Sequence, residues 1–360
     1  MLNIGAGKTH IQQFLAALNI PCLTSTAMSR LEADMGKKVI EVARQSCDEA
    51  LAKEIEMTQG QDGTDVDAGL SVSFDAGWST RGSGRQYNSD TGHGALIGSE
   101  TGKCVAFGVK SRRCRKCETA EKNHQTVEAH DCYRNWTGSS KAMEPAMGVE
   151  MISELKEKGV RVKSLTMDND STTIAHVRAL HGDIRKLSDK NHTKKSIISA
   201  LRDMSQTHKA MSNPKTVSYI AKLIMYAMQQ KQGDVAGLRD RLGQIIPHIF
   251  GDHTLCDAEW CVYQTHPANF TYKSLPFKRP LSNDALKVAL QNLMAKYIAK
   301  AENLAYLGSS QGNEALNNTV ASKAPKSRAY GGSGSAMYRV SAAVSQKNYG
   351  PGWVVKVNNL

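Results

Sequence analysis

The first part of the chain shows the three-and-four spacing of apolar positions that marks amphipathic helices. Two such series cover residues 11–18 and 28–42, and Pro21 separates them because proline disfavours a continuous helix. The stretch 59–69 is rich in glycine and acids, which is typical of a linker. We therefore predict an N-terminal helical segment and linker over residues 1–65. The two helices could form a helix-turn-helix DNA reader, but the second carries as many acids as bases, which favours packing on the core.

Strand-like patterns begin after this linker. Short apolar runs cover 70–74, 94–97 and 104–109, and the last two flank a Ser-Glu-Thr-Gly turn typical of a hairpin. A helical pattern over 143–158 and a further strand over 160–167 follow. A crossover of this kind places its second strand parallel to and beside an earlier one, here the strand 70–74. The pattern predicts an α/β core with a mixed sheet flanked by helices over residues 66–208.

Helical periodicity dominates the second half of the chain. Apolar positions recur at helical spacing in 194–206 and through most of 214–306. We predict a helical insertion over residues 209–305. A last helix and a basic C-terminal segment would then occupy residues 306–360.

The chain is basic, with 46 Lys and Arg against 34 Asp and Glu and a net charge of +12. Such a surface attracts polyanions, although a solvated basic face would give the same composition. The residues after Glu314 contain no acid at all, and two lysines stand near the start of the helix that follows Asp189. A helix start suits phosphate contact, and an ordinary helix cap would explain that segment equally. The candidate DNA contacts are Lys194, Lys195, Lys323, Lys326 and Arg328.

The sequence also suggests a compartment. No apolar run approaches the roughly 18 residues of a membrane span, and the first residues lack the apolar core of a signal peptide. We therefore expect an intracellular protein with no membrane partner. Eight cysteines in such a compartment are more often thiols or metal ligands than disulfides.

Three acids stand where a metal site could assemble. Asp75 and Asp168 each close an apolar strand-like run, and Glu314 opens a helical stretch far downstream. Carboxylates suit Mg²⁺ or Mn²⁺, and three of them can hold two ions that promote phosphodiester cleavage. This is the layout of a ribonuclease-H-like nuclease core. Asp170 is the alternative second acid, although its position favours the cap of the next helix. Any one of these acids alone could be an ordinary surface residue.

Two Cys/His clusters have the residue types of closed zinc sites. The first consists of Cys114, Cys117, His130 and Cys132, within an insert over residues 112–135. His124 is a substitute ligand for that cluster. The second consists of His248, His253, Cys256 and Cys261. These thiols could instead be buried core residues, and His248 beside Pro247 could cap a helix, but the first segment is too polar to join a core.

Six segments resemble, in their order along the chain, the Mutator-like transposase domain of animal DNA transposons and of genes derived from them. They are Val72–Trp78, Asn135–Glu144, Met167–Ser171, Asp189–Lys195, Phe250–Cys261 and Gly312–Asn317. No single segment is decisive, but six in family order make a specific signal. The resemblance implies that Asp75, Asp168 and Glu314 are the DDE triad of a cut-and-paste transposase. It also implies a ribonuclease-H-like fold with a helical insertion between the second and third acids.

The resemblance therefore predicts an enzyme. We expect a DDE-type DNA transposase that uses two Mg²⁺ or Mn²⁺ ions per active site, together with structural Zn²⁺. It would cleave at transposon ends and transfer the freed strand to target DNA, as a homo-oligomer in the nucleus. The alternative is a transposon-derived DNA- or protein-binding protein without cleavage activity. A host nuclease on the same core is a third reading, since fold alone does not fix function.

Overall fold

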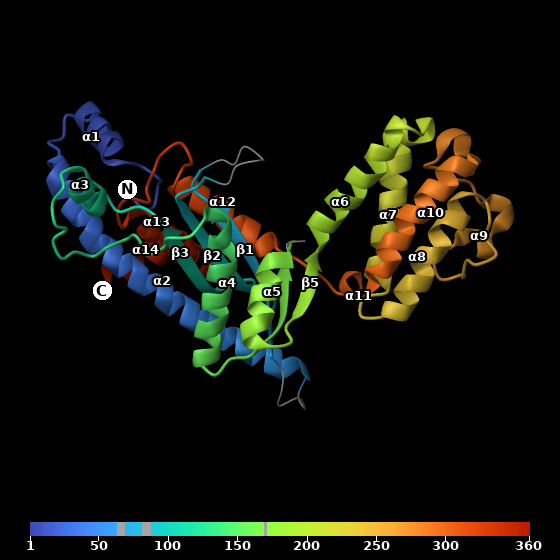
Figure 1. The fold of residues 1–360 in the computed structure, drawn as a ribbon, viewed down its shortest axis with the longest axis horizontal. Coiled ribbons are helices and arrows are strands. Elements are labelled where there is room, and N and C mark those ends of the chain that lie inside the picture. The colour runs from blue at the N-terminus through green and yellow to red at the C-terminus, as the bar shows by residue number, and fades with distance from the viewer. Residues whose placement is uncertain (63–68, 81–87, 169–170) are drawn as a thin grey trace. The chain divides into compact units, whose positions relative to one another are not determined.

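The computed structural model describes residues 1–62, 69–80, 88–168 and 171–360 (Figure 1). The chain forms two compact units, one of Met1–Arg185 with Ser310–Leu360 and one of Lys186–Ser309. The architecture is mixed α/β, with strands flanked by helices, as the sequence predicts. Residues 186–208, which the sequence pattern assigned to the core, belong to the second unit instead.

The first unit is built on strands in the order β3-β2-β1-β4. Their bounds are β1 Leu70–Trp78, β2 Thr91–Gly98, β3 Cys104–Ser111 and β4 Val162–Met167. β1 pairs antiparallel with β2 and parallel with β4, and β2 pairs antiparallel with β3. The predicted hairpin and the predicted neighbour of the first strand are both confirmed. β1 is longer than predicted because its pairing with β2 continues to Trp78, so Asp75 lies inside the strand and does not close it.

Helix α4 (Ser140–Glu157) covers one face of this sheet. The side chain of Ser139 caps the helix by accepting a hydrogen bond from the Ala142 amide. Met143, Met147 and Met151 recur at four-residue spacing and are buried in one core with Val72 and Phe74 of β1, together with residues of α5 (Ser171–His181). The side chains of β1 that alternate with Val72 and Phe74 therefore point to the opposite face.

That opposite face is covered by helices from both ends of the chain (Figure 1). They are α2 (Ser25–Asp62), α12 (Gln311–Lys323) and α13 (Ser335–Tyr349). Their core includes Ala43 of α2, Leu316 of α12 and Val344 of α13, with Ile97 of β2. α2 continues through residues 59–62, which were predicted as linker; residues 63–68 lie outside the described part of the chain. The remaining helices of this unit are α1 (Lys8–Ala17), α3 (Arg115–Lys122) and α14 (Trp353–Asn358).

The second unit is largely helical, as the periodicity of its apolar residues predicts. Its α-helices are α6 (Lys190–Asp203), α7 (Pro214–Gln230), α8 (Val235–Ile249), α9 (Val262–Thr265), α10 (Asp284–Ala299) and α11 (Ala301–Leu304). Short 3-10 turns cover Met204–Gln206, Lys209–Ser212, Pro267–Asn269 and Pro276–Lys278. Strands β5 (Arg185–Asp189) and β6 (Leu307–Gly308) pair in parallel. The core joins Ile224 of α7, Leu242 of α8 and Leu290 of α10. Among the described residues, no helix combines the length and apolarity that a membrane crossing needs.

Candidate functional site

Asp75 and Asp168 follow the same rung of the parallel β1–β4 ladder. The pairing ends with Ser73 of β1 opposite Thr166 of β4, and each acid lies two residues beyond. Adjacent strands are about 4.8 Å apart, so the side chains of the two acids extend from neighbouring stretches of backbone. Asp75 is half-buried and Asp168 is exposed. The alternative second acid, Asp170, lies outside the described residues.

Two asparagines fix α12 to the sheet face that carries Asp75. Asn313 is buried, and its amide nitrogen donates to the carbonyls of Ser73 (3.3 Å) and Ala95 (2.9 Å), while its oxygen accepts from the Ser73 hydroxyl at 2.6 Å. Asn317, four residues later, donates from its amide nitrogen to Oδ2 of Asp75 at 2.8 Å. Residues four apart share one face of a helix, so both amides meet the sheet.

Glu314 lies in the first turn of α12 and is half-buried. It directly follows Asn313 and precedes Asn317 by three residues, a spacing that makes the two neighbours on the helix surface. The start of a helix also stabilises a negative side chain. The contacts of Asn313 and Asn317 therefore hold the turn that carries Glu314 against β1, the strand of Asp75.

His93 on β2 is a residue that sequence reasoning missed. It pairs opposite Gly77 of β1, and its Nε2 lies 2.9 Å from Oδ1 of Asn317. Burial lowers the pKa of His93 to about 4, against the opposing effect of the Asn317 contact, so the imidazole is neutral at pH 7. A Cβ at Gly77 would overlap the imidazole ring, so only glycine lets the ring lie across β1. Gly77 and Asn317 both lie in the segments that resemble the family, and that was the one available signal.

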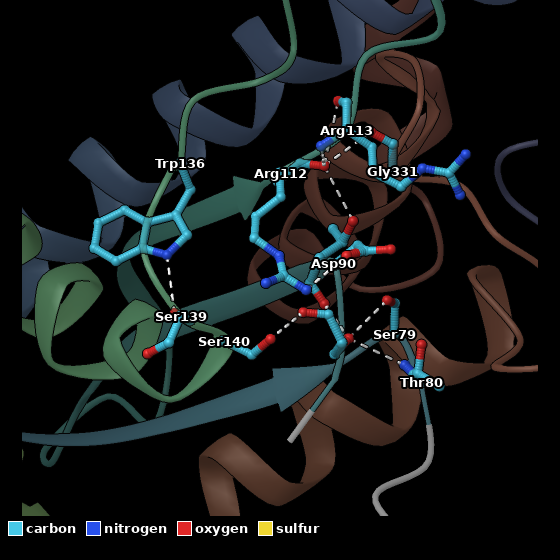
Figure 2. Close-up of polar contacts among 12 residues, drawn as sticks. Ser79, Thr80, Asp90, Arg112, Arg113, Trp136, Ser139, Ser140 and Gly331 are labelled. Carbon is cyan, nitrogen blue, oxygen red and sulfur yellow. Dashed lines mark hydrogen bonds and ion pairs between the residues drawn. The ribbon is translucent and has the colours of Figure 1, made fainter. Parts of the chain in front are cut away.

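Polar contacts hold the residues that directly follow β1 and directly precede β2, as Figure 2 shows. The hydroxyls of Ser79 and Ser89 are 3.0 Å apart, and the Ser140 hydroxyl of α4 donates to the Ser89 carbonyl at 2.7 Å. Asp90 forms an ion pair with Arg112 at 2.7 Å, just after β3. The ends of β1 and β2 near Asp75 are thus tied to both α4 and β3.

The first Cys/His cluster assembles in the structure with the predicted ligands. The ligand atoms of four residues lie within 4.8 Å of one another: Cys114, Cys117, His130 and Cys132. Nε2 of His130 is 3.2 Å from the Cys114 sulfur, and its Nδ1 is 2.8 Å from the Glu128 carbonyl oxygen. A carbonyl can only accept, so Nδ1 carries the proton and Nε2 presents a lone pair to the thiols, as a metal ligand must. The substitute ligand His124 is not part of this cluster.

The thiols of this cluster differ in proton affinity. Burial raises the pKa of Cys114, but hydrogen bonds from the backbone of Cys117 and Tyr133, together with the neighbouring His130 side chain, outweigh it and lower the value to about 6. Burial and the neighbouring thiol of Cys132 raise the pKa of Cys117 to about 11. The Cys114 thiolate therefore forms readily, and a bound cation would be needed to hold Cys117 as a thiolate, which is the form that metals bind.

The second Cys/His cluster also assembles, in the second unit. Its four ligand atoms lie within 4.8 Å and belong to His248, His253, Cys256 and Cys261. Nδ1 of each histidine faces the Cys261 sulfur, at 3.4 Å for His248 and 3.3 Å for His253. The Tyr272 hydroxyl donates to the His248 carbonyl, so it accepts from Nε2 of His253 at 2.8 Å. Burial lowers the pKa of His248 to about 4 and that of His253 as well, which keeps both imidazoles neutral. Both clusters could hold a metal ion such as zinc.

One predicted DNA contact is not available to DNA. Lys323 is buried, and its ammonium donates to the backbone carbonyl (2.8 Å) and the side-chain oxygen (3.0 Å) of Asn3. It ties the start of the chain to α12, because a buried ammonium needs such acceptors. The other four predicted contacts are exposed: Lys194, Lys195, Lys326 and Arg328.

Comparison with known families supports the resemblance seen in the sequence. The family model for Mutator-like transposase matches residues 1–261, which include Asp75, Asp168 and both Cys/His clusters, and Glu314 lies beyond the matched range. No match is found among curated proteins or among solved structures. The matched range covers well over half of the 360 residues. The chain therefore belongs to the Mutator-like transposase family.

Proposed function

We propose that this protein is a metal-dependent DNA transposase whose active site is formed by Asp75, Asp168 and Glu314. Membership of the family implies a nuclease or transposase class. The observation that carries the proposal is the hydrogen bond from Asn317 to Asp75. It joins the helix of the third acid to the strand of the first acid, and the second acid follows the parallel neighbour of that strand.

The three carboxylates would hold two Mg²⁺ or Mn²⁺ ions, which suit hard oxygen ligands. When bound, such a pair supplies an activated nucleophile and charge stabilisation for the leaving oxygen of a phosphodiester. The protein itself orients the carboxylate ligands. Oδ1 of Asp75 accepts from the Ala76 amide at 2.9 Å, and Oδ2 accepts from Asn317 at 2.8 Å. Contacts of this kind orient a ligand before it meets a cation.

The wider fold supports the same proposal. Three antiparallel strands followed by a parallel fourth agree with a ribonuclease-H-like core, which we propose for the first unit. We also propose zinc for both Cys/His clusters, since thiolate and imidazole in sets of four favour that ion. The basic surface would bind the transposon ends and the target through their phosphates. We also propose that the protein acts on chromosomal DNA in the nucleus, as a homo-oligomer.

A cleavage assay tests it. Wild-type protein with Mg²⁺ or Mn²⁺ should cut DNA that carries candidate terminal repeats and transfer the freed strand. Asp75→Asn should abolish cleavage without weakening DNA binding, because a carboxylate that repels phosphate is neutralised while the lysines remain. Asp240→Asn, at an exposed position on α8, is the matched control and should cut normally. DNA binding without cleavage by the wild type on any end sequence would instead support a binding protein that no longer cuts.

A further inference from the structure

We infer that His93 is a positioning residue of the proposed active site, acting on Asp75 through the side-chain amide of Asn317. The inference rests on the proposed function, because it assigns His93 a role toward the carboxylate that would hold metal. The three side chains come from β2, α12 and β1, and hydrogen bonds of 2.9 Å and 2.8 Å join them in series. A matching pattern of donors and acceptors fixes the direction of each bond.

The direction of both hydrogen bonds follows from the charge of the Asp75 carboxylate. An ionised carboxylate only accepts hydrogen bonds, so the nitrogen of the Asn317 amide must face it. The amide oxygen then faces His93 and also only accepts. His93 must therefore carry its proton on Nε2 and donate it to Asn317. A neutral histidine with this tautomer prevents the amide from turning its oxygen toward Asp75, since the amide nitrogen would then meet the Nε2–H donor.

The surroundings keep the three groups in place. Asn313 locks the first turns of α12 onto Ser73 and Ala95, which leaves Asn317 little freedom to shift along the sheet. Gly77 leaves room for the imidazole ring, and any larger side chain there would displace it. The His93 side chain lies on the same sheet face as Asp75, because the paired residues His93 and Gly77 share a face and Gly77 is two residues from Asp75.

Loss of the His93 donor should let the Asp75 carboxylate move more freely, while the residues that would hold the metal stay the same. Outer contacts of this kind are worth 10–100-fold, roughly, in metal affinity or activity. His93→Leu removes the donor and fills the same space with an apolar group. His93→Gln keeps an N–H donor at a similar distance from the backbone. The pair therefore separates a hydrogen-bonding role from simple packing.

The test uses the whole chain with zinc bound, and it makes two measurements. The first is Mn²⁺ binding without DNA, monitored through the electron paramagnetic resonance signal of free Mn²⁺. The second is Mn²⁺-dependent DNA cleavage. Asp75→Asn is the reference for loss of the site. We expect His93→Leu to bind Mn²⁺ about 10–100-fold more weakly and to need correspondingly more Mn²⁺ for cleavage. His93→Gln should stay close to the wild type, and the thermal midpoints of both variants confirm that they are folded.

The outcomes separate the inference from the proposed function. Mn²⁺ binding that Asp75→Asn leaves unchanged would overturn the proposed metal site and the inference with it. If Asp75→Asn weakens Mn²⁺ binding but His93→Leu does not, the metal site stands and the positioning role is wrong. Equal losses in His93→Leu and His93→Gln, with lowered thermal midpoints, would also overturn the inference, since His93 would then serve only the packing of the sheet.

Discussion

At the scale of single residues, the proposed site depends on side chains that carry no catalytic chemistry of their own. Asn313 and Asn317 are amides: Asn313 donates to backbone carbonyls of the sheet, and Asn317 donates to the Asp75 carboxylate. Gly77 contributes by having no side chain, which admits the ring of His93. These roles follow from close approach between β1, β2 and α12, so each residue is explained by its neighbours in space.

The half-buried His93 predicts a pH dependence of stability. Its pKa in the folded protein is about 4, below the 6.5 of an unperturbed histidine, because of burial. As the pH falls below 6.5, His93 binds a proton in the unfolded chain but stays neutral in the folded chain. The free energy of unfolding therefore falls until the pH reaches 4. At pH 5 this effect is on the order of 2 kcal/mol.

Urea unfolding of the wild type and of His93→Gln at pH 7.5 and pH 5 measures it. All other titrating groups are common to both proteins, so the difference between their pH-dependent losses reports His93. We expect the wild type to lose more stability on acidification than His93→Gln. Equal losses in the two proteins would show that the histidine is not held neutral by burial.

At the scale of elements, the periodicity of apolar residues predicts most helices and strands, because each depends on local pattern. The hairpin β2–β3 and the parallel neighbours β1 and β4 follow from short connections and crossover rules. The length of β1 could not be predicted from its own sequence. Gly77 is a weak strand former, and only the antiparallel pairing with β2 keeps that part of the chain extended.

The same limit applies to the site. Asp75, Asp168 and Glu314 could be chosen by resemblance, and the Cys/His clusters by residue type and spacing. His93 stands in a strand with no local mark of function, and its role depends on a helix more than 200 residues away in sequence. Lys323 shows the converse, since a lysine in a basic segment is expected at the surface, and a contact with Asn3 at the start of the chain buries it.

Glu54 gives a test of how α2 is joined to the sheet. It is buried on α2, and its carboxylate accepts from the amides of Glu100 (2.9 Å) and Thr101 (2.8 Å) and from the Thr101 hydroxyl (2.6 Å), in the turn between β2 and β3. Glu54→Gln places an amide nitrogen against these donors. We expect it to lower the free energy of unfolding by about 2 kcal/mol, measured in urea. Glu56→Gln, at an exposed position on α2, should change stability little, and equal effects of the two would contradict this role.

At the scale of the whole molecule, each of the two compact units contains one Cys/His cluster. The first cluster follows β3 of the first unit, in a segment with little apolar content, and the second joins the end of α8 to the loop before α9. The first segment has few apolar side chains to hold it, while the second also packs rings such as Phe270 and Tyr272 around its histidines. A bound ion would add to the local stability of both segments. The metal content of each unit should therefore be separable.

Elemental analysis tests this independence. Purified protein should carry close to two zinc ions per chain, with one lost in Cys117→Ser and the other in Cys256→Ser. A chelator should make residues 112–135 and 248–272 sensitive to protease while the sheet core stays resistant. Cys22→Ser, at an exposed cysteine outside both clusters, is the control and should keep both ions. Metal-free protein in which the thiols of both clusters react in the native state would contradict both sites.

The central claim is that three acids far apart in sequence share one divalent metal site. With hydrogen peroxide and ascorbate added, Fe²⁺ in such a site reduces the peroxide to hydroxyl radicals, which cut the nearest backbone. The fragments of the chain then report which segments surround the ion. We expect cuts near Asp75, Asp168 and Glu314 together, all suppressed by excess Mg²⁺ and all lost in Asp75→Asn. Cuts near Asp75 and Asp168 with none near Glu314, or cuts that persist in Asp75→Asn, would contradict the shared site.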